Sequence, residues 1–363
     1  MLTLEKILEE SKHSIGICNS CRYCEGFCAV FPAMEKRLDF TTADMHYLSN
    51  LCHNCSECFY ACQYAPPHEF NVNIPQQLAQ VRLGTYTEYA WPGGIAKLFQ
   101  KNGLIATLIF VMTLIVLFVG ASIFNSSGPA NGNFYAIFPH NFLVIVFGSA
   151  FAWMFIAILM GFKNYLKDIE PDVKSLFTGG NVKQALSDAL SMKYLHGNIK
   201  TGCTYPDDNI SPWRRYFHHF TFYGFMLCFA ATSSGTIMHY LFGMSAPYPF
   251  FSVPKLLGTV GGVSLAIGTL GLFVLKTKAD ESIKDIRQMG MDYAFIALLF
   301  LTAITGLALM IWRETNAMPS LLIIHLSLIL ALFVTMPFGK FVHAFYRFGA
   351  LLKYAKESKD STH

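Results

Sequence analysis

The chain has 363 residues, of which 53% are hydrophobic and only 14% are charged. About a quarter of the residues of a soluble globular protein are charged, so this composition excludes an ordinary soluble enzyme and indicates a membrane protein. The formal net charge of +4 is too small to indicate a nucleic-acid partner. The start, MLTLEKILEESKHS, predicts an amphipathic helix and lacks the apolar core of a secretory signal.

The polar N-terminal part contains eight of the ten cysteines, in two runs with the same C-x2-C-x2-C-x3-C spacing. The runs are Cys18, Cys21, Cys24, Cys28 and Cys52, Cys55, Cys58, Cys62. This spacing is that of thiolates that hold 4Fe-4S clusters in bacterial ferredoxins, where the fourth cysteine of one run binds the other cluster. We therefore expect one cluster on Cys18, Cys21, Cys24 and Cys62, and a second on Cys28, Cys52, Cys55 and Cys58.

Zinc sites and disulfides are the alternatives for these cysteines. Zinc takes four ligands from paired half-sites and leaves no role for a third cysteine at the same spacing in both runs. Disulfides are disfavoured if this end lies in the reducing cytoplasm. Ala29 and Gln63 replace the proline that usually follows the fourth cysteine, and 23 residues separate the runs. These departures favour a small helical ferredoxin-like module over the compact two-hairpin ferredoxin.

The rest of the chain contains six apolar segments long enough to cross about 30 Å of hydrocarbon, which takes about 20 helical residues. We expect these spans near residues 103–124, 141–162, 218–242, 254–275, 291–312 and 319–339. The connections at 125–140 and 243–253 carry no charged residue, whereas the connections on the other side are rich in lysine and arginine. The positive-inside rule therefore places both termini and the clusters in the cytoplasm.

The long connection at residues 163–217 has two open interpretations. Residues 181–196 have helical spacing of apolar residues, and the following TGCTYPDDNISP is rich in turn formers. Such a segment either covers the cluster module or receives a partner, or it is a plain surface excursion.

Four histidines on the third and sixth spans suggest haem ligation. His239 and His325 lie inside the apolar spans, where ionisable side chains usually mark a functional path. His218, or alternatively His219, and His343 stand at the inner ends. His325 and His343 are 18 residues apart, five helical turns or about 27 Å, so they share a face. Because the two helices are antiparallel, we expect His239 opposite His325 and His218 opposite His343, as ligands of two b-type haems.

Alternatives to the ligation of two haems stay open for these histidines. One haem only, quinone-binding histidines, or polar anchors at helix ends would also explain them, and His140 at the start of the second span fits an anchor. Gly258, Gly261, Gly262 and Gly268 indicate close helix packing. Cys203 and Cys228 lie outside the two runs and are expected to be ordinary thiols.

The expected fold class is mainly α: a small helical ferredoxin-like module with two 4Fe-4S clusters, followed by a six-helix transmembrane bundle of cytochrome b type. The expected domains are 1–74 for the cytoplasmic cluster domain, 75–102 for a linker and interfacial segment, 103–345 for the transmembrane domain with its loop at 163–217, and 346–363 for a cytoplasmic tail.

The runs CNSCRYCEGFCAVFPAM and CHNCSECFYACQYAPPHEF, with RRYFHHFTFYGFMLCFAATSSGTIMHY and PFGKFVHAFYRF, resemble the tricarballylate or citrate utilisation protein B family over nearly the whole chain. The resemblance implies an iron-sulfur protein of a bacterial inner membrane. Its partner would be a soluble FAD-dependent dehydrogenase that oxidises tricarballylate to aconitate, and its electrons would pass towards the respiratory chain.

We therefore expect electrons to pass from the partner's reduced FAD through two 4Fe-4S clusters, and through haem b, to membrane quinone. No nucleotide-binding glycine loop or catalytic dyad is visible in the sequence, so chemistry on the carbon substrate is expected on another chain. The alternatives are a membrane redox sensor, which would need an output domain, and a tricarboxylate transporter. A transporter would need cationic or helix-terminus sites at mid-membrane, where the sequence places no Lys or Arg.

Overall fold

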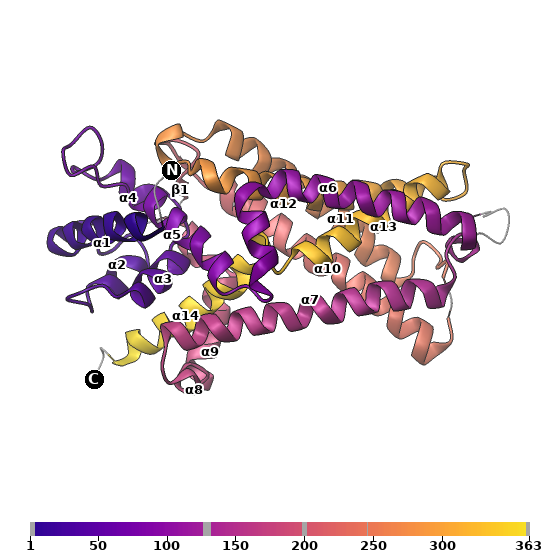
Figure 1. The fold of residues 1–363 in the computed structure, drawn as a ribbon, viewed down its shortest axis with the longest axis horizontal. Coiled ribbons are helices and arrows are strands. Elements are labelled where there is room, and N and C mark those ends of the chain that lie inside the picture. Colours follow the sequence, from indigo (N-terminus) through magenta and orange to yellow (C-terminus); the bar gives the residue numbers. More distant parts are fainter. Residues whose placement is uncertain (1–3, 126–131, 198–201, 245, 361–363) are drawn as a thin grey trace.

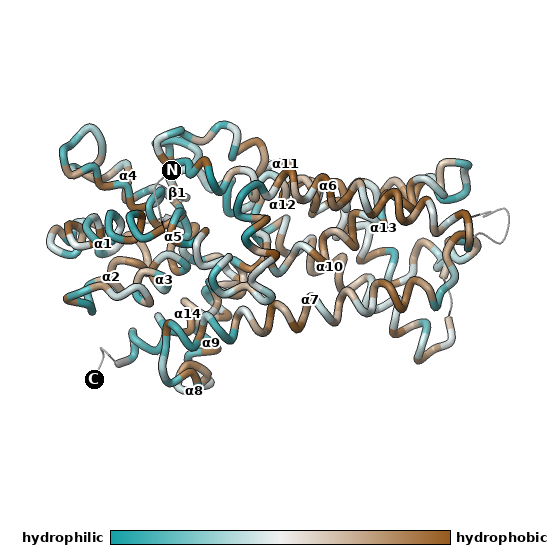
Figure 2. The backbone as a smooth tube through the Cα atoms, in the orientation of Figure 1, coloured by the Kyte–Doolittle hydropathy of each residue, from teal (hydrophilic) through white to brown (hydrophobic). Residues whose placement is uncertain are grey.

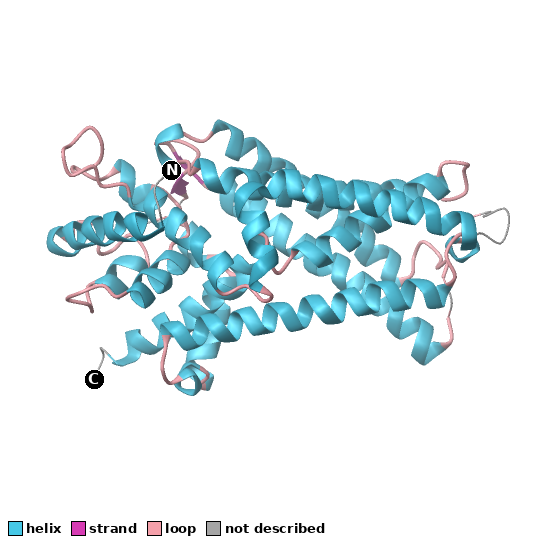
Figure 3. Ribbon diagram, in the orientation of Figure 1, coloured by secondary structure: helices cyan, strands magenta, loops and turns pink. Residues whose placement is uncertain are grey.

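The computed structural model describes residues 4–125, 132–197, 202–244 and 246–360 (Figure 1). These residues are mostly helical (Figure 3), which confirms the mainly α prediction. Within these described residues, six helices are long and apolar enough to cross a membrane, as expected of a multi-pass membrane protein. They are α6 (Gly93–Asn125), α7 (His140–Ile169), α10 (Trp213–Phe242), α11 (Val253–Lys278), α12 (Ile286–Trp312) and α13 (Met318–Thr335).

In two of these helices, a single residue determines a bend or an end. The backbone of Asn102 is not helical (φ −159°, ψ 87°), so α6 bends where the predicted linker meets the first span. The Asn102 side chain accepts a hydrogen bond from the backbone N–H of Ile105 at 3.1 Å and restarts the helix. The last span ends at Thr335, before the predicted residue 339, because Pro337 has no N–H to donate to the preceding turn of the helix.

The N-terminal module consists of α1 (Leu4–Cys21), α2 (Val30–Met34), α3 (Thr42–Leu51), α4 (Glu57–Tyr60) and α5 (Ile74–Glu88). Thr41 and Asp44 form a capping box at the start of α3, and the Asn73 side chain caps α5. The module lies at the hydrophilic end of an elongated molecule, and the apolar helices extend away from it (Figure 2). Both ends of the described chain lie at this end, opposite the α10–α11 and α12–α13 connections (Figure 1).

The module shares one hydrophobic core with segments from the rest of the chain. The inner end of α7, α9 (Gly179–Leu190) and α14 (His343–Asp360) all contribute buried residues to it. Tyr165 of α7 stacks on Tyr346 of α14 with ring centroids 4.9 Å apart. Arg37 of the module pairs with Glu357 of α14 at 2.6 Å. The described part of segment 346–363 is thus a helix packed against the module.

The connection at 163–217 also packs onto the module. It contains α8 (Val173–Leu176), α9, the short 3-10 helix η2 (Lys193–Leu195) and a two-stranded antiparallel sheet, β1 (Cys203–Thr204) with β2 (Ile210–Ser211). Leu176 and Ala185 are fully buried in the shared core. The remaining 3-10 helices are η1 (Phe134–Ala136), η3 (Glu281–Ile283) and η4 (Lys340–Val342). This packing supports the interpretation that the connection covers the cluster module.

Glycines bring α10 and α11 into close contact, as their pattern predicts. A Cβ added at Gly268 would lie 2.4 Å from the backbone nitrogen of Thr221, and one at Gly261 would lie 2.8 Å from that of Cys228. At Gly258 the nearest atom would be 3.6 Å away, an ordinary contact distance. The helix backbones therefore approach most closely towards the module, where larger side chains do not fit.

Candidate functional site

The two cysteine runs have the same local backbone feature. The residue after the second cysteine of each run lies in the left-handed region, with φ 55° at Arg22 and 69° at Ser56. Residues other than glycine rarely adopt this conformation, and it clusters at functional sites. Cys18 and Cys21 are on the last turns of α1, and Cys58 is on α4. The repeated spacing therefore folds into a repeated turn.

The structure brings the cysteines together across the two runs. The neighbours of the Cys18 thiol include Cys62, Cys24 and Cys21, and those of Cys28 include Cys55 and Cys52. The neighbours of Cys58 include Cys55, Cys28 and Cys52. The last cysteine of each run thus lies with the other run. This is the arrangement that the crossed ligand assignment needs.

Burial is the main cause that raises the pKa values of Cys18, Cys24 and Cys55. Burial, followed by the neighbouring Cys62, raises the pKa of Cys18 to about 12, and also that of Cys24. Burial raises the pKa of Cys55 to about 12, although Arg214 opposes the effect. Metal ions bound here would supply the positive charge that keeps such thiols as thiolates and would offset the cost of grouping them.

The space between the thiols fits a polynuclear group. A cavity of about 250 Å³ is lined by cysteines of both runs, including Cys18, Cys24 and Cys62. Within the described parts of the chain, no three His, Cys, Asp or Glu side chains converge closely enough for a single metal ion. Zinc needs its sulfur ligands at about 2.3 Å from one ion, whereas a 4Fe-4S cluster distributes its thiolates over four irons. Eight cysteines in two sets of four, with the last cysteine of each run beside the other run, are a donor set for two such clusters.

Three arginines surround the loop of the second run, a feature that the cysteine pattern did not indicate. Arg82 and Arg347 both donate to the backbone carbonyl of Cys52, the latter at 2.8 Å. Arg214 donates to the carbonyls of His53, at 3.0 Å, and Asn54. Burial, followed by nearby Arg347, lowers the pKa of His53 well below its usual value. We call Arg82, Arg214 and Arg347 the arginine clamp.

The β1–β2 hairpin closes over the same loop. Cys203 is buried beside Cys55, and its sulfur accepts a hydrogen bond from Arg214. The Arg214 guanidinium also lies over the Tyr205 ring, 4.4 Å from its centroid. Cys203 is therefore a packed thiol next to the second run. Cys228 lies on α10 against Gly261, far along the chain from either run.

The inner histidines face each other. The ring centroids of His218 on α10 and His343 at the start of α14 are 6.2 Å apart. Two imidazoles on one iron place their centroids about 6 Å apart, given metal–nitrogen distances of about 2 Å. Nδ1 of His343 donates to the Lys340 carbonyl at 2.5 Å, which leaves Nε2 free, and Nδ1 of His218 is a buried atom without a partner among the described residues. These residues fit a bis-histidine haem.

The alternative residue His219 lies elsewhere. Its ring is 5.7 Å from that of Tyr223, on the same helix. The facing partner of His343 is thus His218.

The outer histidines are not brought face to face. The His239 ring stacks on His140 with centroids 4.3 Å apart, and Nδ1 of His325 lies 2.9 Å from the Thr305 hydroxyl of α12. His325 also packs on Gly306. The pairing of His239 with His325 stays a prediction, and His140 is the neighbour that helical spacing did not indicate.

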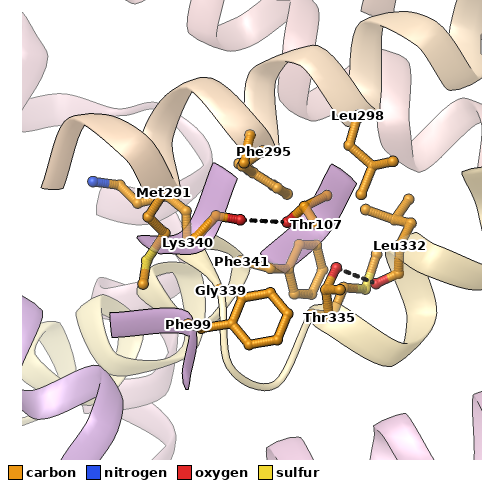
Figure 4. A pocket seen from close by; sticks show the side chains of 13 residues that line it. Phe99, Thr107, Met291, Phe295, Leu298, Leu332, Thr335, Gly339, Lys340 and Phe341 are labelled. Atoms are coloured by element: carbon orange, nitrogen blue, oxygen red, sulfur yellow. Dashed lines mark hydrogen bonds between the residues drawn. The ribbon is translucent and has the colours of Figure 1, made fainter. Parts of the chain in front are cut away.

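An ion-paired group joins α11, α12 and η4. Asp292 of α12 pairs with Lys276 of α11 at 2.5 Å and with Lys340 of η4 at 2.8 Å. Lys340 also borders a small cavity between α6, α12 and α13, whose accessible volume of about 20 Å³ suits one water molecule (Figure 4). Thr107 and Thr335, which line it, bond to backbone carbonyls of their own helices.

Comparison with known proteins gives two matches along the chain. The family model described as citrate utilization protein B matches residues 95–362, and the model of its Fer4-like domain matches residues 11–88. The chain is 47% identical to citrate utilization protein B of Escherichia coli over 99% of its own length and 97% of that protein. No solved structure matches the chain significantly. The chain therefore belongs to the citrate utilization protein B family.

Proposed function

We propose that the protein is a membrane electron-transfer subunit. It would accept electrons from the reduced FAD of a soluble dehydrogenase acting on tricarballylate or a similar citrate-like acid, and deliver them to membrane quinone. The name of the Escherichia coli relative refers to citrate utilization. This name supports a tricarboxylate as the substrate of the partner. The protein would lie in the inner membrane of a bacterium, with both termini in the cytoplasm.

The grouping of cysteines across the two runs is the observation that carries this proposal. Cys18, Cys21, Cys24 and Cys62 would hold one 4Fe-4S cluster, and Cys28, Cys52, Cys55 and Cys58 the other. When bound, each cluster supplies a one-electron redox centre, which a two-electron flavin needs in order to be oxidised in single steps. The chain's own part is to orient the thiolates and to bury the second site.

His218 and His343 would hold one b-type haem at the end of the bundle that faces the module. Their facing rings and the fixed tautomer of His343 support this ligand pair. A second haem on His239 and His325 stays a prediction that haem content will decide. The inner histidine pair lies close to the second cysteine run, because two arginines of the clamp are on the helices that carry the pair.

The test is an anaerobic preparation assayed for iron, sulfide and haem, followed by quinone reduction in the presence of a chemically reduced flavoprotein partner. We expect about eight cluster irons, at least one haem, and quinone reduction that needs both proteins. Zinc or no metal at the cysteines would contradict the proposal. Clusters without quinone reduction would favour a redox sensor, and tricarboxylate uptake into vesicles without electron flow would favour a transporter.

A further inference from the structure

The two cysteine groups differ in the charged side chains that surround them. The Cys52–Asn54 backbone receives hydrogen bonds from the arginine clamp, and Arg82 is buried while Arg214 and Arg347 are half-buried. The hydrogen bonds of the clamp go to backbone carbonyls and to the Cys203 sulfur. Among the described residues, no carboxylate forms an ion pair with any of the three.

The first group has no comparable set of arginines among the described residues. Glu57 is a charged neighbour of Cys24, and also of Cys203 beside the second group. Two cations on this side are Arg22, which is exposed, and Lys12, which is half-buried and pairs with Glu9 at 2.9 Å. Water screens surface charges of this kind strongly. Cys21 is exposed and borders an open groove between α1 and Tyr64 and Phe70.

Buried positive charge without a carboxylate partner is costly unless another anion balances it. Four thiolates around an iron-sulfur cube carry net negative charge, and each added electron increases it. Hydrogen bonds, net charge and solvent exposure set the potential of such clusters. Positive charge at the second group therefore favours the reduced state there. Exposure to water also favours the more negative, reduced state, so at the first group it acts against this difference, and the charge of the three arginines has to outweigh it.

The clamp also reaches the inner histidines. Arg214 precedes His218 by four residues on α10, and Arg347 follows His343 by four residues on α14, so each histidine has a clamp arginine one helical turn away. The two arginines hold the Cys52 loop while their helices present the facing rings. The second cysteine group is thereby fixed next to the histidine pair.

We propose that the arginine clamp makes the cluster held by Cys28, Cys52, Cys55 and Cys58 the stronger electron acceptor of the two, and so directs electrons from the exposed side at Cys21 to the histidine pair. One electron moves at a time: the exposed site is oxidised and the buried site is reduced. The reductant is the reduced flavin of the partner and the acceptor is the haem on His218 and His343, so this inference rests on the proposed function.

The test is an anaerobic redox titration of the whole protein, followed by electron paramagnetic resonance. A Cys21→Ser substitution marks the signal of the exposed cluster. We expect the marked signal to have the lower midpoint potential. If the marked cluster has the higher potential, the proposal is overturned, whatever the arginine variants do.

Arg347→Gln should lower the midpoint potential of the unmarked cluster. The expected change is at least a tenfold decrease in the equilibrium constant for its reduction, which is about 59 mV for a one-electron couple. Arg347→Lys should restore most of it because charge rather than hydrogen-bond geometry sets the effect. Arg215→Gln is the matched control, since Arg215 is adjacent to Arg214 but donates to the Ser191 carbonyl. Arg214→Gln repeats the test if Arg347→Gln loses iron.

The outcomes separate the two proposals. Absence of clusters in the unaltered protein refutes the proposed function. Clusters whose potentials shift equally in Arg347→Gln, or as much in Arg215→Gln, refute the directing role of the clamp and leave the proposed function standing.

Discussion

The rings of His218 and His343 face each other at 6.2 Å with their planes at 80°. The two residues are 125 positions apart in the chain, and both stand where the bundle meets the module. Nδ1 of His343 is committed to the Lys340 carbonyl. The pair therefore offers two imidazoles of defined orientation at the junction of the polar and apolar parts.

We predict that His343→Ala and His218→Ala each abolish the haem absorption of the inner site and leave the cluster resonances unchanged. The reason is that each removes one of two axial ligands. Haem content by the pyridine haemochrome assay and electron paramagnetic resonance will measure the two effects. His219→Ala is the control, because its ring packs on Tyr223. Haem loss in the control but not in His218→Ala would show that the neighbour ligates.

Cys58→Ser should remove or weaken one cluster and lower the cluster iron from about eight to about four atoms per chain. The thiol of Cys58 lies among Cys55, Cys28 and Cys52, where a hydroxyl is a poorer iron ligand. Iron and sulfide assays measure the change. Cys228→Ser should retain full iron, since this residue packs within the α10–α11 contact. Equal iron in both variants would argue against the ligand assignment.

Gly268→Ala should destabilise the bundle by about 1–3 kcal/mol, the usual cost of overpacking. The added methyl would meet the Thr221 backbone at 2.4 Å, and a backbone cannot rotate away as a side chain can. Gly258→Ala on the same helix is the matched comparison, because its methyl has 3.6 Å of room. Thermal unfolding in detergent will rank the variants. A lower unfolding temperature for Gly258→Ala than for Gly268→Ala would mean that the helices pack differently.

Asp292→Asn should cost about 1–3 kcal/mol of stability, because it leaves the half-buried ammonium groups of Lys276 and Lys340 without their counter-charge. Glu314→Gln is expected to be near neutral, since its contact with Arg313 is exposed and 3.9 Å long. Unfolding temperature and cluster content measured together will tell stability from redox effects. An unchanged unfolding temperature in Asp292→Asn would show that the lysines find other partners.

The sequence predicts well those features whose signal is local in the chain. The cysteine spacing is local, and it reappears as a repeated left-handed turn at Arg22 and Ser56. The six apolar spans follow from hydropathy, and the glycines of α11 indicate its contact with α10. In each case the signal lies within one element or one pair of adjacent elements.

What the sequence does not predict depends on how distant elements meet. The clamp arginines are on α5, α10 and α14, and no spacing rule links residues 82, 214 and 347. Helical periodicity places His239 and His325 on defined faces but does not say which helix each face meets. α10 runs along α11, and at its far end His239 lies on His140 of α7 instead. Long-range packing decides such contacts.

The last helix of the chain, α14, supplies Arg347 to the Cys52 loop and Glu357 to Arg37. Translation delivers the cysteines first and these two side chains last, after all six apolar helices. These two contacts can therefore form only after all six apolar helices have been synthesised. A chain that lacks α14 would leave the Cys52 loop without Arg347 and Arg37 without Glu357.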